Sequence, residues 1–193
     1  MADFRTIYRG NLWSGSESRS GPGSSRASTA LLAAWLVDLV RELGIRSVLD
    51  AACGEGLWMP DLPGYVGVDI VPEAIETARA AHPSREYRVA SVIDGPLPHA
   101  ELIVTRDFMQ HLSLDDGVRA AATLRAAGAE WLVASSYRDG DNSAGAESAW
   151  HAHRVNLEVS PFNFGPPERF VCDGYDELGI LRDEPKIMGL WRL

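Results

Sequence analysis

The chain lacks several features that would narrow its function at once. Its 193 residues contain one lysine, Lys186, two cysteines, Cys53 and Cys172, and no cluster of basic residues. Two isolated cysteines give neither a disulfide framework nor the ligand spacing of a zinc site. The formal net charge is −9, and without a basic patch a nucleic acid is not expected as the main partner, because that affinity depends on neutralising phosphates.

Long apolar runs are also missing. Residues Met1 to Asn11 are polar and charged, whereas a signal peptide has an apolar core. The longest apolar helix candidate is interrupted by Asp38, so no membrane span is expected. We therefore expect a cytoplasmic protein without membrane partners. At 193 residues with 46% hydrophobic content, the chain fits one globular domain, present as a monomer or homodimer.

A strand that runs into a glycine turn organises the rest of the chain. Apolar residues lead to Asp50, and the turn that follows contains Gly54 and Gly56. Glycine can adopt dihedral angles that a side chain disfavours, which suits a loop that approaches a ligand closely. The pattern predicts a strand that ends in a ligand-binding loop.

A second apolar run, Tyr65 to Asp69, ends in another carboxylate. In nucleotide-binding α/β sheets, an acid about 20 residues beyond the glycine turn commonly binds ribose hydroxyls. Asp50 and Glu55 would repel a pyrophosphate, but they suit a ligand that carries an ammonium or a sulfonium. The alternative is an ordinary strand, turn and helix of some other α/β protein.

The periodicity of apolar residues predicts alternating helices and strands. Helices are expected over 27–43, 71–81 and 114–127, with only a short one possible between the first two strands. Strands are expected over 46–50, 65–69, 87–92, 102–107, 131–137 and 187–193, the last pairing near 170–172 or 180–181. This alternation predicts a parallel, doubly wound α/β sheet.

Two segments fall outside the alternation. Residues 1–26, named the leader below, are rich in Gly, Ser and Arg, but they also contain Phe4, Tyr8 and Trp13. The composition leaves two alternatives, a disordered tail or a lid across the cofactor site. Residues 138–167, named the insert, combine aromatic, proline and polar residues, which favours an ordered functional segment over disorder. We expect one domain over 27–193 with the insert on its substrate side.

The pattern Asp50-x-x-x-Gly54-x-Gly56, followed by Asp69, resembles the first motif of class I S-adenosylmethionine-dependent methyltransferases, which usually have glycine where Ala52 stands. The order of elements also resembles that family's Rossmann-like fold, a mostly parallel sheet with an antiparallel strand near the C-terminus. Within the family, the chain is similar to a subgroup of small, mostly uncharacterised bacterial methyltransferases that share motifs found here at 17–24, 53–58, 106–111 and 156–167.

The resemblance implies S-adenosylmethionine as the cofactor. Ser91 and the N–H of Val92 are the candidates for the adenine, with Asp94 as a substitute. The full set of expected cofactor-binding residues is Asp50, Ala52, Cys53, Gly54, Gly56, Trp58, Asp69, Ile70, Ser91, Val92 and Arg106.

Asp107 and His111 are the candidate catalytic residues, because the acceptor binds beyond the carboxyl ends of the fourth and fifth strands in this fold. They lie on one face if the chain is already helical there. His111 could take a proton from the acceptor, with Asp107 orienting His111 or the substrate. The alternative is that His111 only caps or packs the helix. His151 and His153 lack an evident third ligand, so no metal is expected.

The insert supplies most of the expected substrate contacts. Its arginines could bind a carboxylate or phosphate, and its aromatic residues could close a small pocket. The candidates are Arg138, Trp150, Arg154, Asn156, Phe162 and Phe164. The hypothesis is methyl transfer to a nitrogen or oxygen atom of a small polar or anionic metabolite, such as a natural-product, sugar or amino-acid type. The alternatives are a nicotinamide-dependent oxidoreductase and a catalytically silent protein that binds the cofactor.

Overall fold

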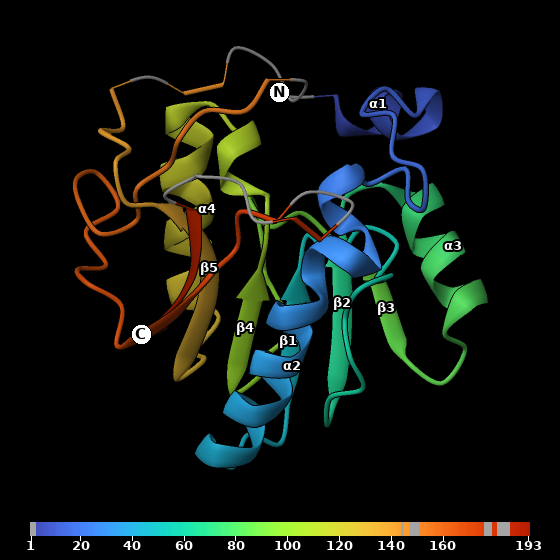
Figure 1. Ribbon diagram of the computed structural model, residues 1–193, viewed down its shortest axis with the longest axis horizontal. Helices are drawn as coiled ribbons and strands as arrows, with labels where there is room; N and C mark the ends of the chain where they lie inside the picture. Colours follow the sequence, from blue (N-terminus) through green and yellow to red (C-terminus); the bar gives the residue numbers. More distant parts are fainter. Residues whose placement is uncertain (1–2, 144, 147–150, 176–178, 181–185) are drawn as a thin grey trace.

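A single seven-stranded sheet forms the centre of the molecule (Figure 1). The computed structural model describes residues 3–143, 145–146, 151–175, 179–180 and 186–193. The sheet order is β3-β2-β1-β4-β5-β7-β6. The strands are β1 (Val48–Ala51), β2 (Tyr65–Asp69), β3 (Glu86–Val89), β4 (Leu102–Thr105), β5 (Trp131–Tyr137), β6 (Arg169–Cys172) and β7 (Lys186–Arg192).

The pairing of these strands confirms the predicted fold class. Strands β1 to β5 pair in parallel, so their carboxyl ends meet at one edge of the sheet. Strand β7 runs antiparallel to both β5 and β6. The fold is the Rossmann-like α/β fold with an antiparallel C-terminal strand.

Helix boundaries follow the capping signals in the sequence. The α-helices are α1 (Phe4–Gly10), α2 (Arg26–Leu43), α3 (Pro72–Ala81) and α4 (Leu114–Ala126). The Ser25 side chain caps α2, which ends at Gly44 with φ 67°, and the Ser113 side chain accepts the Asp116 N–H at the start of α4. Two 3₁₀ turns, η1 (Pro22–Ser24) and η2 (Met109–His111), complete the set. Within the described residues, no helix is long and apolar enough to cross a membrane.

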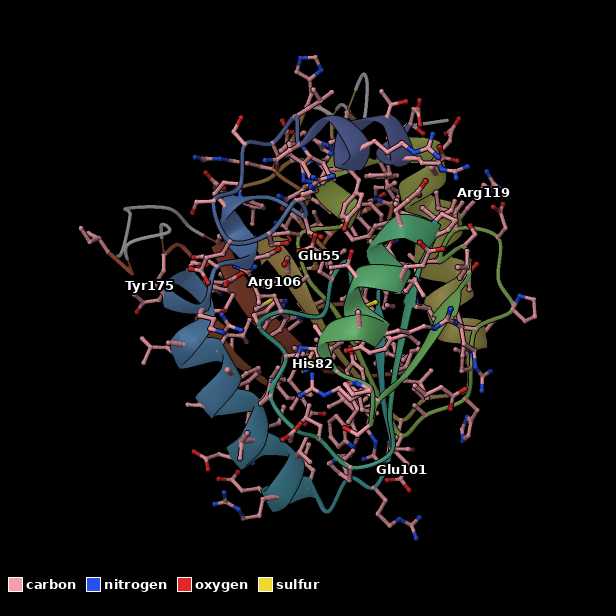
Figure 2. All side chains as sticks on the ribbon, turned by 90° about the vertical axis from the view of Figure 1, so that its right-hand side faces the viewer. Glu55, His82, Glu101, Arg106, Arg119 and Tyr175 are labelled. Atoms are coloured by element: carbon pink, nitrogen blue, oxygen red, sulfur yellow. The ribbon has the colours of Figure 1, made fainter. Side chains whose placement is uncertain are left out.

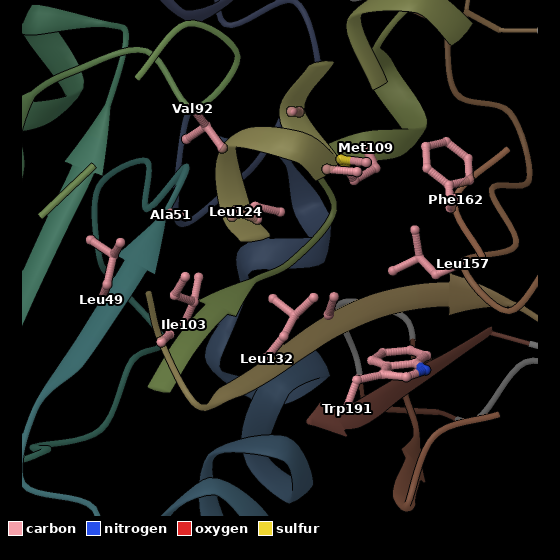
Figure 3. Packing of buried hydrophobic residues seen from close by; sticks show 14 of the residues in the cluster. Leu49, Ala51, Val92, Ile103, Met109, Leu124, Leu132, Leu157, Phe162 and Trp191 are labelled. Atoms are coloured by element: carbon pink, nitrogen blue, oxygen red, sulfur yellow. The ribbon is translucent and has the colours of Figure 1, made fainter. Parts of the chain in front are cut away.

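Side chains of the sheet alternate between two apolar layers. Leu102 and Val104 face the layer made with α2 and α3, whereas Ile103, between them, faces the layer made with α4. Figure 3 shows the second layer, where Leu124 of α4 lies over the sheet with Ile103 and Leu132. Both faces of the sheet are therefore covered.

The insert contributes to this second layer instead of forming a separate lobe. Val155, Leu157 and Phe162 are 1–2% exposed and pack with Trp191 of β7 (Figure 3). The backbone N–H of Leu157 also donates to the Ser136 hydroxyl at 3.0 Å. Most of the insert that the structure describes is thus anchored to the sheet.

Local differences from the sequence prediction concern the ends of strands. Between the first two strands, where the sequence leaves room for only a short helix, residues 52–64 form turns and extended chain, as the prolines at 60 and 63 favour. Strand β4 ends at Thr105, two residues early, since Asp107 adopts a left-handed φ of 53° that a strand cannot contain. Strand β3 stops at Val89 instead of residue 92.

Candidate active site

A cavity of about 970 Å³, including the space of its open mouth, lies at the carboxyl ends of the parallel strands. We name it the strand-end cavity. Four loops that follow β1, β2, β3 and β4 form part of its wall, and the leader forms the rest. The lining residues used below are Ala52, Cys53, Gly54, Trp58, Asp69, Ile70, Val71, Ser91, Val92, Ile93, Arg106, Asp107 and Phe108, with Phe4, Tyr8, Trp13, Ser20 and Ser24 from the leader.

The glycine turn approaches the cavity in a left-handed conformation. Ala52 has φ 68° and Gly54 has φ 55°. The N–H groups of Ala52 and Cys53 both donate to the Val68 carbonyl at 2.9 Å, which holds the turn on the end of β2. A side chain at Gly54 would place its Cβ 2.3 Å from the Ser20 hydroxyl oxygen. Glycine is required there both by φ and by the leader.

Asp69 joins the two loops next to the cavity. Its carboxylate accepts the N–H of Gly54 and the N–H of Val71, each at 2.9 Å. Burial raises the pKa of this carboxyl group, and the two backbone hydrogen bonds act in the opposite direction. Asp69, which is predicted to bind the ribose, therefore lies on the cavity wall, and its carboxylate is held in a fixed orientation.

Asp50 lies beneath the wall. It is 3% exposed, accepts the Tyr65 hydroxyl at 2.8 Å, and is absent from the cavity lining. Burial is the main cause that raises its pKa to about 7, and nearby Asp69 adds to the shift. Gly56 is likewise behind the wall, where it packs against Tyr87. The structure thus places both as supports of the loop.

The expected adenine residues line the cavity. Ser91 and Val92 both belong to the wall, next to Ile93. The Ser91 hydroxyl bonds Asp94 at 2.8 Å and accepts the Asp94 N–H at 3.1 Å, which fixes the turn after β3. Asp94 itself faces Arg119 outside the cavity. It is thus a support for Ser91.

Four charged side chains form a closed network beside the cavity. Arg106 makes a bidentate pair with Asp173, with Nε to Oδ2 at 3.0 Å and Nη2 to Oδ1 at 2.9 Å. Lys186 Nζ lies 2.5 Å from Asp107 Oδ1 and 3.0 Å from Asp173 Oδ2. Arg106 Nη1 is 3.2 Å from Asp107 Oδ2. Arg106 and Lys186 hold the pKa of Asp107 well below its usual range, although burial opposes this.

Asp107 and His111 do not share a helical face. A shared face required the chain to be helical from Asp107 onward, and the chain is not helical at Asp107. Asp107 reaches the cavity wall, whereas His111 lies behind it, with its ring 5.0 Å from that of Trp13. The Nδ1 atom of His111 is 3.1 Å from the His151 carbonyl, so this nitrogen carries a proton.

The described part of the leader, residues 3–26, packs against the cavity. The Tyr8 hydroxyl bonds Glu55 at 2.7 Å and Thr77 at 3.1 Å, and Arg5 and Arg9 pair with Glu73 of α3. The Gly23 carbonyl accepts a 2.7 Å hydrogen bond from Arg106 Nη1. Figure 2 shows Glu55 and Arg106 beneath the leader. These contacts favour the interpretation of the leader as a lid, which stays a prediction.

Among the substrate residues expected in the insert, those that the structure describes do not line the cavity. Phe162 is 2% exposed in the core, and Phe164 packs on Trp191, so their expected role as pocket walls is wrong. Asn156 is buried and holds the backbone of Arg138, at 3.3 Å. Trp150 lies outside the described residues.

The two arginines of the insert already have partners. Arg138 pairs with Glu158 at 3.3 Å and Arg154 pairs with Asp139, and both arginines are exposed. Neither lines the strand-end cavity. In the part of the chain that the structure describes, no group of three or more His, Cys, Asp or Glu side chains could hold a metal ion.

Several residues of the wall and of the charged network were not expected from the sequence. Asp173 and Lys186 belong to the charged network, and Phe108 and Ile93 belong to the wall. One feature of the sequence could have identified Lys186, since it is the only lysine of the chain and precedes the apolar residues of β7. Asp173 follows a strand in the same way as Asp69, at the end of β6.

Comparison with known proteins was made on the sequence and on the fold. A family model described as "Methyltransferase domain" matches residues 49–127, which include the glycine turn, Asp69, Ser91 and Asp107. No curated protein matches the chain. The fold is similar to many solved methyltransferase structures, at identities that support the fold alone.

Two of these structures match most of the chain. The methyltransferase domain of bacterial CtHen1 has a TM-score of 0.61 at 14% identity, over 86% of this chain and 100% of that one. An S-adenosylmethionine-dependent methyltransferase from Clostridium acetobutylicum ATCC 824 has a TM-score of 0.60 at 14% identity, over 83% and 90%.

A third structure matches only in part. It is CalS10, an amino pentose methyltransferase from Micromonospora echinaspora, with a TM-score of 0.46 at 20% identity. The match covers 53% of this chain and 48% of CalS10, so the chain spans about half the length of that protein. The domain match, the strand order and the placement of the motif residues around one cavity lead to one assignment. Residues 49–127 thus match a methyltransferase domain, and the described chain has the Rossmann-like fold of solved S-adenosylmethionine-dependent methyltransferases.

Proposed function

We propose that the protein transfers the methyl group of S-adenosylmethionine to a nitrogen or oxygen atom of a small polar molecule, with both bound in the strand-end cavity. The observation that carries the proposal is the convergence of four motif loops on one wall, contributed by residues 52–54, 69–71, 91–93 and 106–108. Ligands of open α/β sheets bind beyond the carboxyl ends of the strands in this way.

The wall suits the charge and shape of the cofactor. Asp69 would bind the ribose hydroxyls, and Gly54 allows close approach beside it. Ser91 and Val92 would face the adenine, with Ile70 and Trp58 as apolar contacts. Arg106 would border the cofactor as a wall residue whose charge Asp173 balances.

Asp107 would act on the positive end of the cofactor and on the acceptor. Its carboxylate is held ionised by Arg106 and Lys186, which makes it a weak proton acceptor at neutral pH and a constant negative charge on the wall. Such a charge attracts a sulfonium and accepts a hydrogen bond from an acceptor hydroxyl or amine. His111 stays the candidate base, because a proton on Nδ1 leaves Nε2 as the acceptor atom of the neutral ring.

The leader supports a small acceptor. Phe4, Trp13 and Phe108 form an aromatic group beside the wall, with ring centroids 6.3 Å and 6.5 Å apart for the pairs that involve Phe4. A covered, partly aromatic cavity suits a small molecule, whereas a polymer would need an open groove. An anionic acceptor lacks support from Arg138 and Arg154, which pair with acids outside the cavity.

A nicotinamide-dependent oxidoreductase is the rival enzyme. A pyrophosphate gains from the N-terminus of a helix that begins at the glycine turn, and residues 52–64 contain no helix. This is a stronger argument than the charge of Asp50, whose pKa of about 7 leaves it partly protonated at neutral pH. The structure therefore favours the methyltransferase reaction.

Calorimetric titration with S-adenosylmethionine, S-adenosylhomocysteine and NAD tests the proposal. We expect binding of the first two, strongly weakened in Asp69→Ala and less so in Asp69→Asn, which keeps one acceptor oxygen for the loop. Asp38→Ala, an exposed change on α2, is the control and should bind as the wild type does. Binding of NAD alone, or of none of the three, would overturn the proposal.

A catalytically silent protein would bind the cofactor without using it. Acceptors can be screened by mass spectrometry for a mass gain of one methyl group with S-adenosylhomocysteine formation. With an acceptor in hand, the Asp107→Ala/His111→Ala double variant should lose turnover but keep affinity for the neutral S-adenosylhomocysteine. Unchanged product formation would remove both residues from the reaction.

A further inference from the structure

We propose that Lys186 is a positioning residue, whose ammonium group holds the Asp107 carboxylate at the wall of the strand-end cavity and so sets the affinity for S-adenosylmethionine. The proposal rests on the proposed function, because it assigns Lys186 a task toward the cofactor of that reaction. Lys186 itself does not line the cavity, so it acts through Asp107.

The position of Lys186 in the fold is the first argument. It begins β7, pairs with Tyr137 of β5 in the register of the sheet, and its side chain is 8% exposed. The chain has 18 basic residues, of which Lys186 is the one lysine, so the one ammonium side chain of the protein is also a buried one. Burial of an ammonium group is costly unless carboxylates surround it.

The ammonium group of Lys186 bridges two carboxylates. Lys186 Nζ lies between Asp107 Oδ1 at 2.5 Å and Asp173 Oδ2 at 3.0 Å. Arg106 contacts the remaining oxygen of Asp107 at 3.2 Å. Each Asp107 oxygen thus faces a different cation, and rotation of the carboxylate would separate at least one pair. The compact ammonium can bridge two carboxylates as a point charge, whereas a planar guanidinium favours one of them.

The backbone at Asp107 is also held by the C-terminal strands. Its φ of 53° lies in the left-handed region, which a side chain disfavours unless the surroundings hold it there. The Asp107 N–H donates to the Ser135 hydroxyl at 2.9 Å, and Ser135 and Lys186 both come from the β5–β7 pair. The C-terminal strands therefore fix both the backbone and the carboxylate of Asp107.

A plain electrostatic role makes the opposite prediction. S-adenosylmethionine carries a net positive charge, so removal of a nearby cation should tighten its binding if only charge mattered. If Lys186 positions Asp107, then Lys186→Met should weaken binding of S-adenosylmethionine, by about tenfold for a misplaced charged contact. The sign of the change separates the two roles.

A double-mutant cycle measured by calorimetry with S-adenosylmethionine tests the proposal. We expect Lys186→Met to weaken binding about tenfold in the wild-type background and less than about twofold in Asp107→Asn, where no carboxylate is left to position. Arg192→Met, which removes an exposed cation from the same strand, is the control and should change nothing. If Lys186→Met does not fold, the double variant Lys186→Met/Asp173→Asn replaces it in the cycle, because the double variant keeps the charged network neutral. The reference for this double variant is Asp173→Asn.

A spectroscopic signal checks the same point without a variant of Lys186. Labelling of lysine with ¹⁵N at Nζ gives one side-chain signal from the whole chain. This signal should shift on saturation with S-adenosylmethionine in the wild type and stay in place in Asp107→Asn.

The outcomes are distinct. Wild-type protein that binds neither S-adenosylmethionine nor S-adenosylhomocysteine overturns the proposed function, and this proposal with it. Normal wild-type binding, with Lys186→Met neutral, tighter, or equally weak in both backgrounds, overturns the role of Lys186 alone. An unmoved Nζ signal in the saturated wild type has the same meaning.

Discussion

The Tyr8 hydroxyl donates a 2.7 Å hydrogen bond to Glu55, so the leader is fastened to the loop that follows β1. Tyr8→Phe keeps the buried ring and removes this bond. We expect the leader to open more often and trypsin to cut at its arginines about tenfold faster, as expected for the loss of a hydrogen bond to a charged group. Time-resolved digestion with mass spectrometry measures the rate. Leu31→Ala, on the exposed face of α2, should digest like the wild type, and equal rates for Tyr8→Phe would contradict the docking role.

The contact between Gly54 and Ser20 predicts a compensating pair. In Gly54→Ala the new Cβ would lie 2.3 Å from the Ser20 hydroxyl oxygen, so the leader or the glycine turn must move and cofactor binding should weaken strongly. Ser20→Gly removes the obstructing atoms, and the double variant should recover part of the affinity in calorimetry with S-adenosylhomocysteine.

Gly165→Ala is the matched control for that pair. Gly165 also has a positive φ, of 71°, but nothing lies within 4 Å of an added Cβ. It should cost only the backbone strain of a left-handed alanine, about 1 kcal/mol in unfolding free energy, and leave binding unchanged. Failure of Ser20→Gly to restore any binding would show that backbone strain, and not the leader, makes Gly54 necessary.

Asp50 predicts a pH dependence of stability. Its pKa is raised from 3.8 to about 7 in the folded chain, so the folded state binds the extra proton between about pH 4 and pH 7. The unfolding free energy contributed by Asp50 therefore falls as pH rises through this window, by a total on the order of 4 kcal/mol. Asp50→Asn lacks this titration, so its stability relative to wild type should increase with pH.

Urea unfolding at several pH values measures that difference. Comparison of Asp50→Asn with wild type cancels the titration of groups that do not interact with Asp50. Leu31→Ala, an exposed change on α2 that removes no titratable group, should give a difference that does not vary with pH. A flat difference for Asp50→Asn as well would mean that Asp50 is ionised in the folded protein across this range.

Asp107 predicts selectivity between two forms of the cofactor. S-adenosylmethionine carries a sulfonium charge that S-adenosylhomocysteine lacks, and an ionised wall carboxylate favours the charged form. Asp107→Asn should therefore weaken the binding of S-adenosylmethionine about tenfold and the binding of S-adenosylhomocysteine much less. Asp38→Asn, an exposed change on α2, should leave both affinities unchanged. Equal weakening of both ligands by Asp107→Asn would place the carboxylate away from the sulfur.

Much of the fold could be predicted from local signals. Ser25 and Gly44 delimit α2 as capping and left-handed φ require, and the apolar runs mark the strands because the parallel sheet is covered on both faces. The sequence left room for a short helix in the loop after β1, but the loop contains none, because Pro60 and Pro63 disfavour a helix there.

The site was predictable only where one short motif carries it. Gly54, Asp69 and Asp107 follow strands directly, and parallel pairing brings strand ends together. Phe162 could not be assigned, since an aromatic residue in an irregular segment looks the same in sequence whether it faces a pocket or the core. The link between Arg106 and Gly23 spans 83 positions and leaves no local pattern.

The leader contacts also order the events of folding. The leader is synthesised first, but Glu73, Arg106 and the network residue Asp173 leave the ribosome much later. Contacts between residues so far apart in sequence carry a large loop-closure entropy and form late. We therefore expect the charged network beside the cavity to be complete only once β6 and β7 are in the sheet, so that a nascent chain with the glycine turn alone would retain the cofactor poorly.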